Sequence, residues 1–279
     1  MAIINAYLTL AEYKRGANIN DSTDSDATDD IFIEELIEEV CRLIDDETCR
    51  TFYPRVETRY HDTPDDGLEL WLDDDLLEVI SITNGDDTTV SDSDYNLVPI
   101  NSSPYYAVKL IQSSNETWDL DSGGNSEGVI DVEAIWGYHT NYTQRAWSTG
   151  STVSDDSDVG AADTTIKSAS GTLFDPGQII RIDDEIIRVT AVSTADLTVV
   201  RGENGSTAAA HDDGSTIYIW NPHPPVKSAC RTIVQNEYKR RFGNDTSGSA
   251  TITGAGVVIT PDSIPASAAR IIRNLKRVI

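Results

Sequence analysis

The spacing of apolar and polar residues changes period several times along the chain and predicts an α+β fold. Residues 30–50 carry apolar side chains at intervals of three and four, opposite a face rich in glutamate. This pattern predicts an amphipathic helix that is closed by Pro54. A shorter helix is expected to begin at Leu10, because Thr9 and Glu12 have the spacing of a capping box.

Between residues 56 and 138 the period falls to two, which is typical of β-strands. Short alternating segments are separated by turn sequences such as Asn84-Gly85, so we expect a meander of antiparallel hairpins. A polar bridge rich in Gly, Ser and Asp follows at residues 148–163. Beyond it, closely spaced short strands predict a small barrel-like or sandwich-like module.

Two further helices are predicted after this module. One begins at Val226 and ends at Gly243; the other is opened by Ser263 or Pro265 and reaches the C-terminus. The chain is therefore predicted to contain a discontinuous domain, residues 1–149 and 221–279, with an inserted all-β module at residues 150–220. The acidic helix at 30–50 and the basic helix at 226–242 are expected to pair, within one subunit or between neighbours.

Charge is strongly negative and unevenly distributed. The formal net charge is −26, yet residues 226–279 hold nine Lys or Arg against three acids, a net of +6 that leaves −32 on the preceding 225 residues. We expect the C-terminal part to contact an acidic partner, or an acidic part of another copy. An aspartate-rich surface with few lysines suits a host with concentrated salt, and it also suits a wall along which DNA must slide.

No catalytic motif of high specificity occurs, so we expect no enzyme activity, no cofactor and no metal. The four histidines lie in separate segments, and none is at metal-ligand spacing from another. The loop at 201–214 places His211 beside Asp212 and Asp213, and we interpret it as a structural turn. The alternative is a metal-dependent hydrolase that uses His211 with these aspartates or Glu185. The acidic run 73–75 is interpreted as a solvated face.

The sequence also bears on the compartment. No run of about 18 apolar residues occurs, and the N-terminus lacks a basic start followed by an apolar block. We therefore expect no membrane association and folding in the cytoplasm. Cys41, Cys49 and Cys230 form no C-x-x-C pair and are expected to be free thiols in a reducing compartment.

Several segments together resemble the head–tail connector proteins of tailed viruses, also called adaptor or head-completion proteins. The likeness covers residues 5–146 and 222–279 and follows the order of the segments: AYLTLAEYKRG, IEELIEEVCRLIDDETCRTFYP, LWLDDDLLEVISIT, DYNLVP, VIDVEAIWGY, PPVKSACRTIVQNEYKRRFG and SIPASAARIIRNLKRV. Residues 163–220 look like a small β module that recurs in tail and virion proteins. Its insertion departs from the compact pattern of the family.

The resemblance implies a non-enzymatic virion protein that is assembled in the host cytoplasm and acts at the head–tail joint. Such proteins form a ring, usually of about twelve copies, under the portal; it extends the DNA channel without sequence-specific DNA binding and receives the next connector or tail protein. By analogy, the terminal helix would bind the portal through Arg270, Ile271, Ile272, Arg273, Leu275, Lys276 and Arg277. A tail or baseplate component is the alternative within the same kind of particle.

Overall fold

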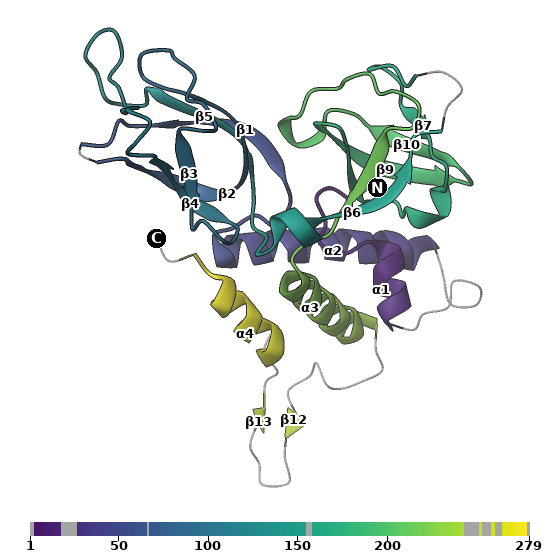
Figure 1. The fold of residues 1–279 in the computed structure, drawn as a ribbon. Coiled ribbons are helices and arrows are strands. Elements are labelled where there is room, and N and C mark those ends of the chain that lie inside the picture. Colours follow the sequence, from purple (N-terminus) through teal and green to yellow (C-terminus); the bar gives the residue numbers. More distant parts are fainter. Residues whose placement is uncertain are drawn as a thin grey trace.

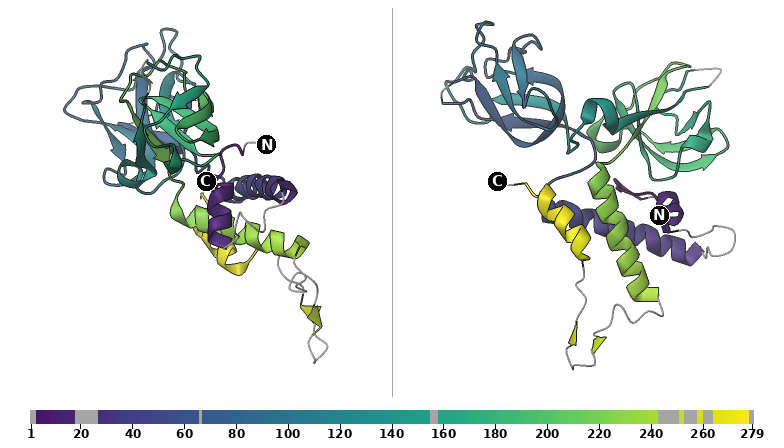
Figure 2. Two further views of the ribbon diagram at one scale, coloured as in Figure 1. Left: turned by 90° about the vertical axis from the view of Figure 1, so that its right-hand side faces the viewer. Right: turned by 60° about the horizontal axis from the view of Figure 1, so that its bottom comes forward.

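A computed structural model describes residues 3–17, 27–65, 67–154, 158–242, 251–252, 258–259 and 264–277. It contains helices and antiparallel sheets, so the predicted α+β class is confirmed. Two separate β units lie side by side, and a layer of helices lies beneath them (Figure 1). The turned views show that the helices stay on this one side of both β units (Figure 2).

The helical layer joins the two ends of the chain. Thr9 and Glu12 exchange the two hydrogen bonds of the predicted capping box, at 3.1 and 3.2 Å. The longest helices pack against each other within the chain, and α3 crosses α2 (Figure 2). Their facing apolar side chains form one shared core that also includes the terminal helix. The helices are α1 (Leu10–Ala17), α2 (Ala27–Thr48), α3 (Pro224–Phe242) and α4 (Ala266–Leu275).

The first β unit is a five-stranded antiparallel sheet with the order β1-β5-β2-β4-β3. Two segments that alternate separately in the sequence form the single strand β2, whose pairing shifts between Trp71 and Leu76. The first part of β2 pairs with β4 and the later part with β5. Because β5 inserts between β1 and β2, strands that follow one another in the chain do not all pair. The strands are β1 (Arg55–His61), β2 (Glu69–Thr83), β3 (Tyr95–Val98), β4 (Tyr105–Leu110) and β5 (Ile130–Trp136).

The second β unit is a six-stranded sheet with the order β6-β11-β8-β9-β10-β7. A bridge between Val153 and Ser168 joins its two edge strands, so the sheet closes around its own apolar core. The sheet begins at Trp147, before the predicted boundary at residue 150, because Trp147 pairs with Trp220. The strands are β6 (Trp147–Thr152), β7 (Thr165–Lys167), β8 (Ile179–Ile182), β9 (Glu185–Ser193), β10 (Asp196–Val200) and β11 (Thr216–Trp220).

Short elements complete the chain. A single π-helical turn, η1 (Tyr142–Ala146), leads from the first β unit into β6, and two 3₁₀ turns, η2 (Gly171–Leu173) and η3 (Glu203–Gly205), lie within the second unit. Strands β12 (Thr251–Ile252) and β13 (Val258–Ile259) form a small hairpin between α3 and α4 (Figure 1).

The turn η3 docks the second β unit against the N-terminal segment and β1. The Asn204 side-chain amide donates to the backbone oxygen of Pro54 and to the side chain of Asn5, both at 2.9 Å. The next residue, Gly205, has φ +84°, and a Cβ built on it would lie 2.2 Å from the Val56 backbone oxygen. A side chain therefore has no room at Gly205 unless the two parts move away from each other.

Two buried histidines occupy the junction between the β units and the helical layer. The rings of His139 and His223 lie 5.6 Å apart between centroids, and Trp220 packs on His139. The His139 ring accepts a hydrogen bond from the Asn141 backbone N–H at 3.0 Å. Burial lowers the pKa of His139. Burial and the neighbouring His139 together lower the pKa of His223 to about 4. Both rings are therefore neutral at pH 7.

Replacing Gly205 with alanine should destabilise the protein by about 3 kcal/mol, since it combines a left-handed backbone with a clash against backbone. Gly214→Ala is the matched control, because Gly214 has φ +87° and a Cβ there would have no neighbour within 4 Å. The control should cost only about 1 kcal/mol. Denaturant unfolding measures both, and equal losses would contradict the docking role of Gly205.

Acidification should weaken the fold through the junction histidines. The unfolded His223 takes up a proton as pH falls below its ordinary pKa of 6.5, whereas the folded ring does so only near 4. Stability from this group is thus present above pH 6.5 and is lost as pH falls toward 4, by about 2 kcal/mol at pH 5. His223→Gln should reduce the difference in unfolding free energy between pH 7 and pH 5. An undiminished difference would show that other groups cause it.

Candidate functional site

The seven predicted portal-binding residues at the C-terminal end fall into three groups: apolar residues, exposed basic residues and Arg277. Ile272 and Leu275 are 7% and 8% exposed and belong to the core shared with α2 and α3, and Ile271 packs against that core. These apolar side chains are already covered by the chain's own helices. In this conformation they cannot supply the buried area that the resemblance implies for a partner.

Three basic residues of α4 and its C-terminal end are on the solvent-exposed side. Arg270, Arg273 and Lys276 are exposed and follow one another at intervals of three along the end of the chain. Among the residues that the structure describes, none of the three has an ion-pair or hydrogen-bond partner. We call these three residues the cationic face. It is a set of like charges available to a partner.

Arg277 differs from the cationic face because it anchors the end of the helix. Its backbone N–H donates to the Thr48 oxygen at 2.8 Å, and its guanidinium contacts Asp74 and the Leu72 oxygen, each at 3.3 Å. Arg277 therefore ties α4 to α2 and to β2. The sequence alone placed it with the portal contacts, but its position is set by contacts within the chain.

The acidic run 73–75 was expected to be a solvated face, and this interpretation was wrong for two of its three residues. Asp74 accepts from Arg55 and Arg59, both at 2.9 Å, in addition to Arg277, and Asp75 is only 6% exposed beside Arg50. The physical reason is that burying a carboxylate is costly unless cations and donors surround it. The sequence does not show these partners, because they come from three separate segments.

The loop around His211 forms a buried polar network rather than an open site. His211 is 1% exposed, with Nδ1 2.8 Å from Asp183 and Nε2 2.9 Å from Glu185. Arg201 forms a two-pronged contact with Glu185, at 2.7 and 2.8 Å. The backbone N–H groups of Gly202 and Ala209 also donate to this carboxylate. The loop that carries His211 is thereby fixed to β9.

The Glu185 carboxylate is held in its charged form. Burial alone would raise its pKa, but hydrogen bonds from Arg201, the two backbone N–H groups and His211 outweigh burial and lower the pKa to about 2. Both carboxylate oxygens are thus occupied by donors from within the module. Asp183 was missed by the sequence interpretation, which considered Asp212, Asp213 and Glu185 as partners of His211. Within the described part of the chain, no group of three or more His, Cys, Asp or Glu side chains is arranged to hold a metal ion.

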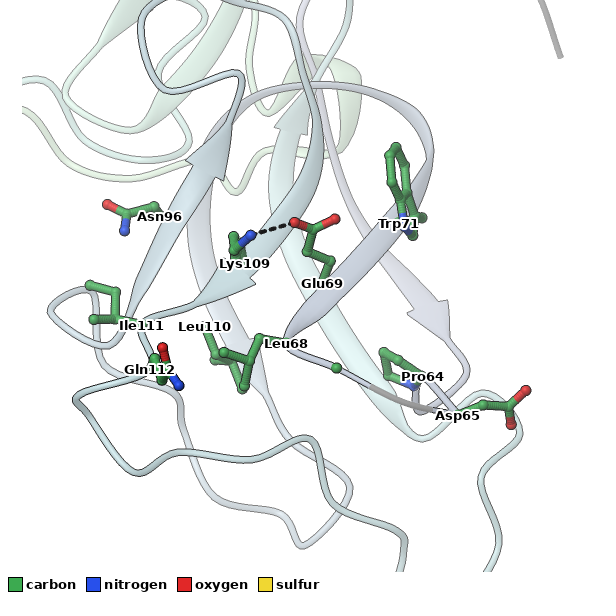
Figure 3. Close-up of a pocket in the computed structure, with 11 residues that line it drawn as sticks. Pro64, Asp65, Leu68, Glu69, Trp71, Asn96, Lys109, Leu110, Ile111 and Gln112 are labelled. Carbon is green, nitrogen blue, oxygen red and sulfur yellow. Dashed lines mark hydrogen bonds and ion pairs between the residues drawn. The ribbon is translucent and has the colours of Figure 1, made fainter.

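A second exposed feature lies on the five-stranded sheet around Trp71. Trp71 is 64% exposed and stacks on Tyr106, with ring centroids 5.5 Å apart and an angle of 12° between the planes. An open hollow of about 950 Å³ beside it contains the ion pair between Lys109 and Glu69, at 2.6 Å (Figure 3). Another open hollow, of about 590 Å³, also borders Trp71 and Glu69. Large exposed aromatic side chains of this kind are typical of interaction surfaces.

Comparison with family models and curated proteins gives no indication of the function, so a functional conclusion depends on these surfaces. No protein-family model matches the chain, and no curated protein matches it either. None of the described helices is both long enough and apolar enough to cross a membrane.

Replacing Glu185 with glutamine should destabilise the protein by about 3 kcal/mol, since it leaves Arg201 buried without its counter-charge. Asp183→Asn is the control, because the Asp183 side chain is 62% exposed and its contact with His211 is screened by water.

The wild type should also lose the stability that the Glu185 carboxylate contributes when the pH is lowered. Because the folded pKa of Glu185 lies below the ordinary value of 4.5, the contribution is present above pH 4.5 and is lost as pH falls toward 2. Thermal unfolding of both variants at pH 7 and pH 3 measures these losses of stability. Equal melting temperatures for the two variants would contradict a structural role of the network.

Proposed function

We propose that this chain is a structural protein of a tailed-virus particle, a head–tail adaptor that forms a ring of about twelve copies beneath the portal. The ring extends the DNA channel and provides the docking platform for the next connector or tail protein. Its work is ordered assembly rather than catalysis. The proposal begins from the resemblance of residues 5–146 and 222–279 to connector proteins.

The observation that carries the proposal is the cationic face on an otherwise strongly acidic chain. Arg270, Arg273 and Lys276 stand at the end of a protein with a net charge of −26, yet they have no counter-charge among the described residues. An acidic partner would supply that counter-charge and fix the orientation of the complex. Since the apolar stripe of α4 lies within the chain's own core, this contact with the portal depends on charge rather than on buried apolar area.

The remaining acidity fits a channel through which DNA passes. Clustered carboxylates repel phosphate and disfavour binding to nucleic acid, so DNA can move past the ring. The same acidity suits a host with concentrated salt, where screening reduces repulsion between subunits.

A tail or baseplate component is the second candidate. It is favoured by the inserted β module, which closes around its own core and resembles modules of tail and virion proteins. The two candidates differ in when the protein joins the particle. An adaptor joins DNA-filled heads before tails arrive, whereas a tail component copurifies with tails that lack heads.

A complementation experiment separates them. DNA-filled, tailless heads made without this chain receive the purified protein in salt matched to the host, followed by tails, and infectious particles are counted. The adaptor proposal predicts restored infectivity. No restoration, with folded protein and competent tails, favours the tail or baseplate role.

Reversing the cationic face should weaken portal docking. The triple variant Arg270→Glu, Arg273→Glu and Lys276→Glu should reduce restored infectivity at least tenfold, because like charges at an interface are strongly unfavourable. A control with the same net charge reverses three other exposed cations, Arg145, Lys167 and Lys239. The control should restore infectivity at nearly the wild-type level. Equal results for both triples would rule out a specific contact at the cationic face.

A further inference from the structure

We infer that the hollow between Tyr60 and Trp71 binds an arginine side chain from the protein that joins the ring next. The arginine site is defined by six residues that line it: Tyr60, His61, Asp65, Glu69, Trp71 and Glu127. The identity of the partner rests on the proposed function, whereas the chemistry of the ligand rests on the site itself.

Two aromatic side chains border the site and remain exposed. Tyr60 on β1 is 67% exposed and Trp71 on β2 is 64% exposed. The stacking of Tyr106 on Trp71 holds the indole plane in place. A guanidinium is planar and weakly hydrated, so it stacks on such rings better than an ammonium does. The aromatic borders therefore favour arginine over lysine.

The charge of the site selects a cation. Among the described residues, four carboxylates and no lysine or arginine line the hollow. Glu69 is neutralised by Lys109, and Asp62 accepts from the Gly128 backbone N–H. Asp65 and Glu127 are exposed and have no ion-pair partner within the described ranges of the chain. Phosphate groups are repelled here, which excludes nucleic acid and anionic lipid as the occupant.

His61 contributes a largely buried ring to the lining of the site. It is 8% exposed and lines the hollow, and its Nε2 atom has no hydrogen-bond partner among the described residues. Burial lowers the pKa of His61, so its ring is neutral at pH 7. A buried polar atom without a partner is costly. The Nε2 atom is shielded from solvent, so the five N–H donors of a guanidinium would pair with the exposed carboxylates of Asp65 and Glu127.

The shape of the site fits a protruding side chain of another protein. The hollow holds about 590 Å³ and is open to solvent, which suits a segment laid across the sheet rather than an enclosed small molecule. The occupant is thus an arginine-bearing polypeptide segment. The site lies on the sheet, whereas the cationic face lies on α4, so the ring has separate surfaces for two partners (Figure 1).

Peptide binding to the full chain tests the ligand chemistry. Three synthetic peptides share a Gly/Ser background and carry two arginines, two lysines or two citrullines; citrulline keeps the shape of arginine without its charge. Each is titrated in salt matched to the host while the Trp71 indole N–H signal is followed by NMR, with Trp71→Phe used to assign that signal. The arginine peptide should bind at least tenfold more tightly than the other two. Equal binding of the lysine or citrulline peptide would overturn the assignment.

Variants locate the binding. Trp71→Ala and Glu127→Gln each change an exposed side chain, and each should weaken the arginine peptide at least fivefold. Ile100→Ser is the matched control, because Ile100 is 70% exposed and lies outside the site. Unchanged affinity in Trp71→Ala, read from the backbone signals of the remaining site residues, would place the peptide elsewhere and overturn the proposal.

The particle assay separates this inference from the proposed function. With Trp71→Ala, rings should still join heads, and the later joining of tails should fall at least tenfold. Normal tail joining by this variant would overturn the arginine site while leaving the adaptor role in place. Failure of the wild-type protein to join heads at all would instead count against the adaptor role, and peptide binding would still decide the ligand.

Discussion

The packing of α2 against α3 is the contact on which the rest of the structure depends. It brings together two stretches that are separated by both β units, and their apolar faces also receive α1 and α4. At its centre Cys41 and Cys230 are fully buried, with their sulfur atoms 3.7 Å apart. This core can form only once the chain has passed through both β units, because α2 precedes them and α3 follows them. The inserted module must therefore fold in a way that still lets α2 and α3 meet.

Arginines decide where the acidity of the chain is tolerated. At the junction of sheet and helices, Asp75 is buried and Asp74 is half-buried, and Arg50, Arg55, Arg59 and Arg277 surround these two carboxylates. In the second β unit, Arg201 performs the same role for Glu185. Several of the few basic residues are thus placed beside carboxylates that are removed from solvent. The excess carboxylates remain on the surface, where they produce a strong negative electrostatic potential around the protein.

Two exposed features depart from this distribution. Among the described residues, the cationic face has basic residues without acidic partners, and the lining of the arginine site has acids and aromatic rings but no lysine or arginine. The apolar residues of α4 are used inside the chain, so the helix presents mainly charge outward. Contacts made through charge and stacking are specific and depend on salt, which suits the ordered assembly that we propose.

The sequence by itself determined the secondary structure class, the helix periods, the capping box at Thr9 and the charge asymmetry, because these depend on neighbouring residues. It also identified the segment of α4, but not which of its residues are free. Tertiary structure alone decided that Ile272 and Leu275 are covered and that Arg277 is an anchor. It also brought Asp183, which is distant from His211 in the sequence, into contact with the His211 ring. It also placed β5 between β1 and β2. These outcomes depend on which distant segments meet, and the period of a sequence carries no information about a partner far along the chain.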